Sequence, residues 1–264
     1  MLIDLHSHTI SSHDGFTSEA QMIEACIIRG INAIAITEHD KVSALSSKKF
    51  ADKNIELIPG CEFTTDAGAH ILGLFISSPL PFGSSRHEIV RHIKGQGGFV
   101  VMPHPWKQNS GYMAVHEEDS LIYDFDFIEI LNGGWNSKDY VSGIINLSKK
   151  YDLLMISSSD SHRGCQVGLC VTSINLDKSL YIGDIKKTLE SLKQGDIEHR
   201  IDRKILAVKG RKTRNFQLNQ FYQFLLPLAP WRLKRLLKIL QYKLSNDSRA
   251  SKPDFQTFIP EKND

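Results

Sequence analysis

Short apolar runs of strand length alternate along the chain with segments of helical periodicity. The first two apolar runs cover residues 2–5 and 31–36, and the segment between them carries isoleucines at helical spacing. That segment opens with a capping box, in which Ser18 stands three residues before Gln21, and it stops at Gly30. Strand, helix and strand in this order predict a right-handed βαβ unit with parallel strands.

The alternation continues beyond this first unit. Further strands are expected at 55–61, 71–74, 99–103, 127–132 and 153–157, and helices near 84–96, 137–151 and 180–194. Six or seven strand-then-helix units in roughly two hundred residues fit a closed or nearly closed barrel better than an open sheet. The predicted fold class is therefore α/β, with a distorted TIM-like barrel.

Histidines and carboxylates gather where these strands end. Side chains of a strand alternate in direction, so His6 and His8 project to the same side and can chelate one ion. The second strand ends in a Glu-His-Asp triplet at 38–40, and the carboxyl ends of parallel strands meet at one rim. Imidazole and carboxylate ligands without cysteine suit manganese, iron or zinc better than magnesium alone or an iron–sulfur cluster. The pattern predicts a metal site at this rim.

Six short motifs occur in an order that resembles the PHP family, named for polymerase and histidinol phosphatase domains. They are His-x-His at 6–8, Thr-Glu-His-Asp at 37–40, Gly-Cys-Glu at 60–62, His-Ile-Leu-Gly-Leu at 70–74, Pro-His-Pro at 103–105 and Ser-Asp-Ser-His at 159–162. The resemblance spans residues 1–172, and the ordered set is far more specific than any one motif. It implies a (β/α)7-type barrel with a trinuclear metal centre that hydrolyses phosphate esters.

The resemblance also implies a role for individual residues. Two to three divalent ions per chain would be held, the first by His6, His8, Glu62 and Asp160, the second by Glu62, His70 and His104, and the third by Asp14, His39 and His162. Family members place either a histidine or an aspartate in the first loop. Here His13 and Asp14 are adjacent, so the ligand at this place stays open. The expected catalytic residues are Glu62, Asp160, His162 and Arg163.

The chemistry of phosphate esters explains why such groups would gather. A phosphomonoester carries two negative charges that repel an incoming hydroxide, and divalent ions about 3.5–4 Å apart neutralise them and lower the pKa of a bound water. Arg163 directly follows His162 and is predicted to clamp the phosphate in a bidentate way. Three further acids are predicted to orient the ring N–H groups of histidines: Glu38, Asp40 and Glu129.

The spacing of the motifs bears on the substrate. Only about thirty residues separate His70 from His104, so the chain lacks the covering insertion that some PHP proteins carry there. We therefore expect a small phosphomonoester, such as a nucleotide, histidinol phosphate or a sugar phosphate. The alternatives are a nuclease or phosphotyrosine phosphatase that acts on a polymer, and a non-catalytic metal-binding scaffold. No cysteine stands six residues before an arginine, which argues against a cysteine-based phosphatase. No P-loop motif occurs, which argues against nucleotide hydrolysis by a P-loop enzyme.

Charge divides the chain into two parts. Residues 1–198 hold 17 Lys and Arg against 25 Asp and Glu, whereas residues 199–264 hold 15 against 5. We predict a barrel domain over 1–198 and a basic, partly helical C-terminal extension over 199–264. Within the extension, Pro230 is well placed to begin an amphipathic helix near 230–244 that carries leucines on one face.

Several roles are open for a basic amphipathic helix. It can lie on an anionic membrane surface, dock a protein partner or pack on its own barrel. It can also follow a nucleic-acid backbone, but this role is less expected. The chain opens straight into a strand, and no apolar stretch reaches the length that spans a bilayer. A cytoplasmic protein is therefore expected, with peripheral membrane contact through the tail as the alternative.

Overall fold

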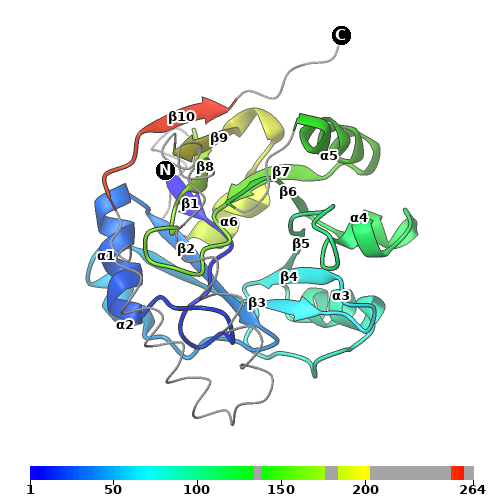
Figure 1. Cartoon of the computed structure of the whole chain (residues 1–264), viewed down its shortest axis with the longest axis horizontal. Helices are drawn as coiled ribbons and strands as arrows, with labels where there is room; N and C mark the ends of the chain where they lie inside the picture. The colour runs from blue at the N-terminus through cyan, green and yellow to red at the C-terminus, as the bar shows by residue number, and fades with distance from the viewer. Residues whose placement is uncertain (134–137, 176–183, 203–250, 259–264) are drawn as a thin grey trace, which may run out of the picture.

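The structure, a computed structural model, describes residues 1–133, 138–175, 184–202 and 251–258. Among these residues, ten strands form one curled mixed sheet (Figure 1). In chain order they are β1 (Leu2–Asp4), β2 (Ala33–His39), β3 (Glu56–Thr64), β4 (His70–Leu74), β5 (Phe99–Met102), β6 (Phe127–Asn132), β7 (Leu154–Ser158), β8 (Cys170–Ile174), β9 (Ile197–Asp202) and β10 (Phe255–Phe258). Their order across the sheet is β10-β9-β8-β1-β2-β3-β4-β5-β6-β7. This confirms the predicted α/β class and the distorted barrel.

Strand direction decides which residues reach the rim. β1, β2 and β3 are parallel, and so are β5, β6 and β7. β4 is antiparallel to both β3 and β5, so those six strands end at one rim and β4 begins there. The sequence predicted strand-then-helix units throughout, but β3 and β4 form a hairpin. The five residues between them, 65–69, are too few for the crossover that a parallel strand requires.

The first and last parallel strands meet just past their carboxyl ends. Ser7 and Ser161 form a parallel bridge, and the backbone N–H of Asp160 donates to the carbonyl of His6 at 2.9 Å. Further from this rim, β7 contacts β8 through a side chain: the backbone N–H of Ser157 donates to Oγ1 of Thr172 at 2.8 Å. The sheet is thereby drawn into a barrel at the rim that carries the polar motifs.

Helices cover the outside of the sheet, apart from the last one, which packs at one end of the barrel. They are α1 (Glu19–Arg29), α2 (Ser47–Ala51), α3 (Arg86–Gly95), α4 (Tyr112–Val115), α5 (Lys138–Tyr151) and α6 (Ile185–Ser191), with 3-10 turns at η1 (Ser120–Asp124) and η2 (Gln194–Asp196). The predicted capping box of α1 is present, since Ser18 and Gln21 bond reciprocally, and Gly30 ends the helix with a left-handed φ of 67°. The helices expected near 84–96 and 137–151 are confirmed as α3 and α5.

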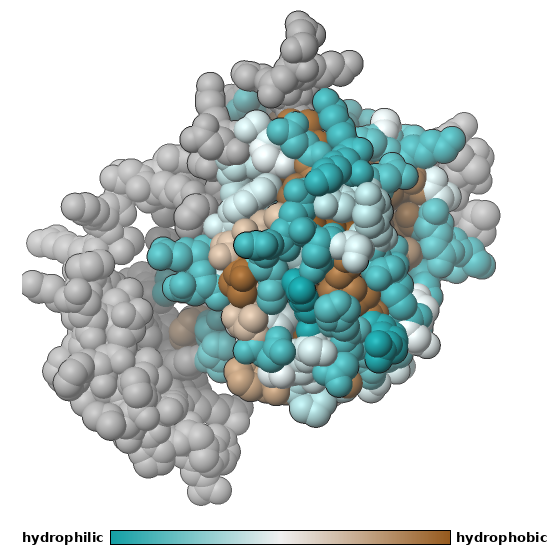
Figure 2. Space-filling view, turned by 90° about the vertical axis from the view of Figure 1, so that its right-hand side faces the viewer, coloured by the Kyte–Doolittle hydropathy of each residue, from teal (hydrophilic) through white to brown (hydrophobic). Residues whose placement is uncertain are grey.

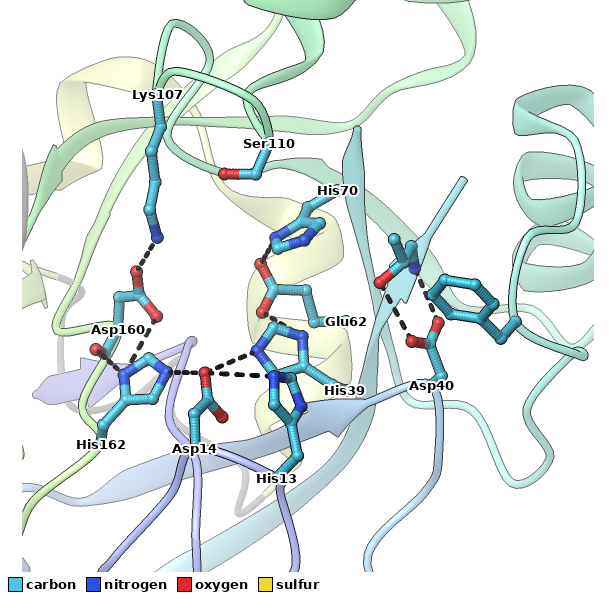
Figure 3. A pocket seen from close by; sticks show the side chains of 12 residues that line it. His13, Asp14, His39, Asp40, Glu62, His70, Lys107, Ser110, Asp160 and His162 are labelled. Atoms are coloured by element: carbon cyan, nitrogen blue, oxygen red, sulfur yellow. Dashed lines mark hydrogen bonds and ion pairs between the residues drawn. The ribbon is translucent and has the colours of Figure 1, made fainter. Parts of the chain in front are cut away.

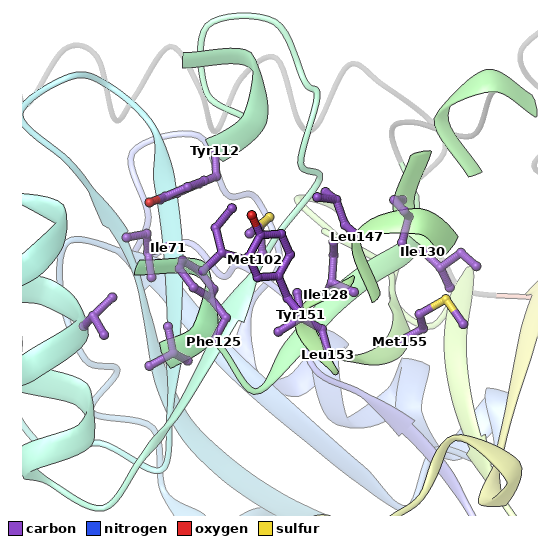
Figure 4. Packing of buried hydrophobic residues seen from close by; sticks show 14 of the residues in the cluster. Ile71, Met102, Tyr112, Phe125, Ile128, Ile130, Leu147, Tyr151, Leu153 and Met155 are labelled. Atoms are coloured by element: carbon purple, nitrogen blue, oxygen red, sulfur yellow. The ribbon is translucent and has the colours of Figure 1, made fainter. Parts of the chain in front are cut away.

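The interior of the barrel is a packed apolar core. It brings together buried side chains from strands all around the sheet, among them Ile3, Ala35 and Phe127, and two from α6, Ile185 and Leu189. Residues near the starts of the parallel strands also pack on this core, namely Met1, Phe99 and Leu154. α6 therefore closes the end of the barrel opposite the polar rim. A second large cluster, part of which Figure 4 shows, lies between β4 to β7 and helices α3 and α5.

Strands β8, β9 and β10 extend the sheet by antiparallel pairing that the sequence did not predict. The predicted boundary between residues 198 and 199 falls inside β9, and β10 returns to pair with β9. His199 lies on β9 and is 2% exposed, and its Nδ1 lies 2.9 Å from Oγ of Ser157. The division into two domains stays a prediction. The amphipathic helix predicted near 230–244 lies outside the described residues.

A buried ion pair fixes β9 to the first helix. Arg29 ends α1 and donates from Nη1 to Oδ2 of Asp202 at 3.0 Å, with 2% and 0% of the two side chains exposed. The same guanidinium donates to the carbonyl of Cys165 at 3.2 Å. Within the described part of the chain, no helix combines the length and apolar character needed to cross a membrane.

Candidate metal centre

The polar residues of the rim come from the ends of neighbouring strands (Figure 3). His6 and His8 follow β1, His39 is the last residue of β2, and Glu62 lies near the end of β3. His70 reaches the same rim because β4 runs in the opposite direction and begins with it. The remaining members lie in loops that follow strands: Asp14, His104, Asp160 and His162. The structure thus brings all nine predicted ligands to one rim.

Glu62 lies at the centre of this group. Its Oε1 atom is 2.8 Å from Nδ1 of His70 and 3.1 Å from Nε2 of His104. Its Oε2 atom lies 3.2–3.3 Å from nitrogens of three other rings, those of His6, His8 and His39. Each oxygen of one carboxylate therefore faces a different set of imidazoles. This is the arrangement that a carboxylate bridging two ions requires, and it agrees with the role implied for Glu62.

Two further groups of ligand atoms flank Glu62. In the first, Oδ1 of Asp160 is 3.3 Å from Nε2 of both His6 and His8, and these atoms with Glu62 lie within 4.8 Å of one another. In the second, Oδ2 of Asp14 is 3.0 Å from Nε2 of His162 and 3.3 Å from Nε2 of His39. His8 completes that second group and so stands between the two.

The first loop presents Asp14, rather than His13, to the other ligands. Asp14 belongs to the group that includes His39 and His162, whereas the side chain of His13 is 75% exposed and its Nε2 lies 3.9 Å from Oδ2 of Asp14. The geometry therefore favours Asp14 as the ligand that the sequence left open.

The buried polar atoms of the site fit divalent cations. Oε2 of Glu62 and Nδ1 of His39 are both buried, lie 3.3 Å apart and make no hydrogen bond. Oδ1 of Asp14 is likewise buried without a hydrogen-bond partner. Buried polar atoms are normally satisfied, and an imidazole nitrogen and a carboxylate oxygen that converge without a hydrogen bond are suitable metal ligands. The donors are nitrogen and oxygen without sulfur, as expected from the sequence, and the choice among manganese, iron and zinc stays a prediction.

Electrostatics within the site couple the carboxylates to the imidazoles. Burial alone would lower the pKa of His6, but the charges of Asp160, Glu62 and Glu129 outweigh it and raise that pKa well above its usual value. Burial alone would raise the pKa of Glu62, yet the surrounding histidines, with His70 the strongest, hold it well below its usual value. Glu62 is thus ionised although it is completely buried, and its charge attracts cations to the bottom of the site.

Of the three acids predicted to orient histidines, Glu129 does so. Its Oε1 is 2.9 Å from Nδ1 of His6, and its Oε2 accepts from the backbone N–H of His104 at 2.8 Å. The prediction was wrong for Glu38, which accepts from the N–H and hydroxyl of Thr9. It was also wrong for Asp40, which accepts from the backbone N–H of Thr64 at 2.7 Å and from the Thr64 hydroxyl at 3.0 Å. These two acids hold the loops of the rim instead.

The basic side chain that lines the pocket is Lys107, whereas the sequence suggested Arg163. A pocket of about 500 Å³ opens over the ligands, and Lys107 lines it with its Nζ 3.3 Å from Oδ2 of Asp160. Arg163 does not line this pocket, and its guanidinium carbon lies 5.7 Å from the ring centre of Phe16. The phosphate clamp predicted for Arg163 stays a prediction. Lys107 was missed, although it stands only two residues after the Pro-His-Pro motif.

Three residues of the rim have left-handed backbone conformations. The φ angles are 53° for Asp40, 27° for His104 and 48° for Asp160. Such angles are costly for residues other than glycine, and they persist where surrounding contacts impose them. Here the backbone N–H of His104 bonds to Glu129 and that of Asp160 bonds to the carbonyl of His6. Two of these strained residues, His104 and Asp160, are candidate ligands, and Asp40 directly follows the candidate ligand His39.

Comparisons with known proteins agree with this geometry. Residues 4–206 match the family model described as the PHP domain. A protein of uncharacterised function from Methanocaldococcus jannaschii is 28% identical over 186 residues, which cover 67% of this chain and 73% of that protein. A 5′-3′ exoribonuclease of Haemophilus influenzae is 36% identical over 76 residues, 27% of each chain.

A solved structure shares the fold. It belongs to a two-domain protein from Bacteroides vulgatus that contains a predicted PHP-like metal-dependent phosphoesterase, and it superposes with a TM-score of 0.58 at 22% identity. The match covers 75% of this chain, which spans 64% of the length of that two-domain protein.

Proposed function

The chain belongs to the PHP domain family, and we propose that, as a metal-dependent phosphoesterase of that family, it hydrolyses small phosphomonoesters at a centre of two to three divalent ions. The observation that carries this proposal is the position of Glu62, whose two carboxylate oxygens face separate sets of imidazoles at 2.8–3.3 Å. When bound, the ions would neutralise the ester oxygens and lower the pKa of the attacking water.

The residues that would hold the ions fall into three groups around Glu62. We assign one ion to the cluster of His6, His8, Glu62 and Asp160. A second is assigned to Glu62 with His70 and His104, whose rings both contact Oε1 of Glu62. A third is assigned to Asp14, His39 and His162, which cluster with His8. Asp160 and His162 lie in the loop after β7 and line the pocket, so both side chains face the space where an ester would bind. Manganese, iron and zinc are the ions that these donors favour.

Lys107 is proposed to bind the phosphate. Its ammonium group lies at the pocket next to Asp160, and the pKa of Lys107 is raised because nearby carboxylates outweigh the effect of burial. The amine therefore stays protonated and can donate to an ester oxygen. A pocket of about 500 Å³ is within the size range of sites that take small molecules. Both features support a small phosphomonoester as the substrate.

Hydrolysis of a polymer is the second candidate. The similarity to a 5′-3′ exoribonuclease over 76 residues favours a nucleic-acid end as substrate. The basic extension predicted over 199–264 would add attraction to a polyanion or to an anionic membrane. A phosphotyrosine substrate and a non-catalytic metal-binding scaffold are further alternatives, and the test below separates them from the proposal.

The test combines metal analysis with a substrate screen. The metal content of the purified full chain is measured by elemental analysis, and turnover with added manganese is measured on phosphomonoesters, a phosphotyrosine peptide, a phosphodiester and 5′-phosphorylated oligonucleotides. Two to three ions per chain with turnover of small phosphomonoesters is the expected result. Turnover confined to oligonucleotides or to the peptide would move the function to a polymer, and metal without any turnover would favour a scaffold.

A further inference from the structure

One large apolar side chain stands exposed inside the pocket of the metal centre. Among the described residues, four large hydrophobic side chains are more than half exposed: Ile10, Ile27, Phe82 and Tyr123. Phe82 is the most exposed of them, at 75%, and it is the one that lines the pocket. Elsewhere, as on the face shown in Figure 2, hydrophobic residues lie in small groups among hydrophilic ones. Single exposed apolar residues are common, but one inside a polar ligand pocket is informative.

The backbone on both sides of Phe82 is fixed to the barrel. The N–H of Gly83 donates to the carbonyl of Thr64 at 3.2 Å, and the N–H of Asp66 donates to the carbonyl of Ser84 at 3.1 Å. Before Phe82, Pro81 restricts the chain and Leu80 packs on the apolar cluster of α3. The phenyl ring is therefore carried by an ordered loop that pairs with the hairpin end, and its exposure is built into the fold.

Phe82 and Lys107 belong to opposite sides of the pocket. Thr64, which holds the loop of Phe82, also binds Asp40, and Figure 3 shows Asp40 on the side of the pocket away from Lys107 and Asp160. The pocket thus has a cationic end suited to phosphate and an aromatic end. A flat ring on the alcohol part of the substrate can stack on the phenyl group. The carboxylate of Asp40 at that end favours a ring that carries N–H donors over a second anion.

We infer that Phe82 is a specificity residue that stacks on a nitrogen-containing aromatic ring in the alcohol part of the ester. The inference rests on the proposed phosphomonoesterase function and names the substrate class. A nucleobase and an imidazole share this chemistry, so a nucleotide and histidinol phosphate are the two sources that the experiment distinguishes. A sugar phosphate without a ring of this kind fills the cationic end alone.

The test compares esters with and without the ring. Values of kcat and KM are measured with the manganese-loaded full chain for adenosine 5′-monophosphate, histidinol phosphate and ribose 5-phosphate. We expect the unaltered protein to prefer one of the two ring-bearing esters. Phe82→Ala should raise KM for that ester at least about 5-fold, the lower end of what base–aromatic stacking supplies, with little change in kcat. Ribose 5-phosphate should change less than about twofold.

Two matched variants complete the design. Phe82→Tyr keeps the flat ring and should behave like the unaltered protein, whereas Tyr123→Ala removes an aromatic side chain of similar exposure that does not line the pocket and should change neither ester. Equal effects of Phe82→Ala on ring-bearing and ringless esters, or no preference in the unaltered protein, would overturn the inference and leave the phosphomonoesterase function intact. Turnover of none of the three esters would count against that function and against the inference with it.

Discussion

The ring nitrogen Nδ1 of His6 lies 2.9 Å from Oε1 of Glu129, and both side chains are completely buried. An ionised carboxylate accepts, so His6 donates from Nδ1, and Nε2, which faces Glu62 and Asp160, is the nitrogen that would exchange its proton for a metal ion. Glu129 lies on β6, so the contact also ties the two sides of the barrel together.

Glu129→Gln should lower metal affinity about 10- to 100-fold, the range found when an outer hydrogen-bond partner of a ligand is altered. The amide can present its NH₂ group to Nδ1 and so weakens the control over which nitrogen of His6 is protonated. Manganese titration followed by equilibrium dialysis measures the effect. Glu56→Gln, at the start of β3 and away from the rim, is the matched control and should bind metal as the unaltered protein does.

Glu62→Gln keeps the shape of the central side chain and removes its charge. We expect turnover to fall more than about 100-fold, beyond the range for an outer partner, and metal content to drop while the barrel still folds. Elemental analysis, turnover and circular dichroism on the same sample check the three parts. Full activity in this variant would exclude a bridging role for Glu62.

Removal of metal should lower the melting temperature as well as abolish turnover. Ions that bind only the folded state stabilise it by about 2.7 kcal/mol when their concentration is 100 times the dissociation constant. Calorimetric scans before and after chelation, and again after manganese is restored, measure the shift. An unchanged melting temperature upon complete metal loss, shown by elemental analysis, would speak against ions bound among the buried ligands.

The stability of the metal-free protein should fall as the pH drops from about 6.5 to about 4, in part because of His199. Burial lowers the pKa of His199 to about 4, so between those values the unfolded chain binds a proton that the folded chain does not. The free energy of unfolding therefore decreases with falling pH, by about 3 kcal/mol from this group.

Urea unfolding of the metal-free protein at pH 7 and pH 4.5 tests this statement. His199→Gln keeps a polar group opposite Ser157 but cannot titrate, so between pH 7 and pH 4.5 it should lose about 2 kcal/mol less than the unaltered protein. Equal losses in the two proteins would show that His199 is protonated in the folded state as readily as in the unfolded state.

The sequence predicted the parallel part of the fold well, because the apolar runs are followed by polar groups and α1 ends at Gly30, a recognisable stop signal. It did not predict the direction of β4, since periodicity is the same for parallel and antiparallel strands and only the short connection 65–69 distinguishes them. Nor did it predict β9, in which His199 and Asp202 are buried polar residues that look like surface residues in a sequence.

The candidate site was predictable where strands set the direction of side chains. His6, His39 and Glu62 follow from strand ends that share one rim. Arg163 and Lys107 lie in loops, where no period fixes the direction of a side chain, and the structure brings Lys107 rather than Arg163 to the pocket. Glu38 and Asp40 were misassigned for a related reason: Thr9 and Thr64 compete with the histidines as hydrogen-bond donors.

The return of the chain as β10 affects any attempt to learn what the basic extension does by deleting it. A protein shortened after Asp202 would lose Phe255, which packs beside the cluster of α1, and the backbone partners of β9 along its outer edge. Unpaired strand edges recruit other chains, so such a truncation would confuse loss of binding with aggregation. Replacing lysines and arginines of the predicted helix by glutamines would leave the edge protected, and so would isolate the contribution of charge.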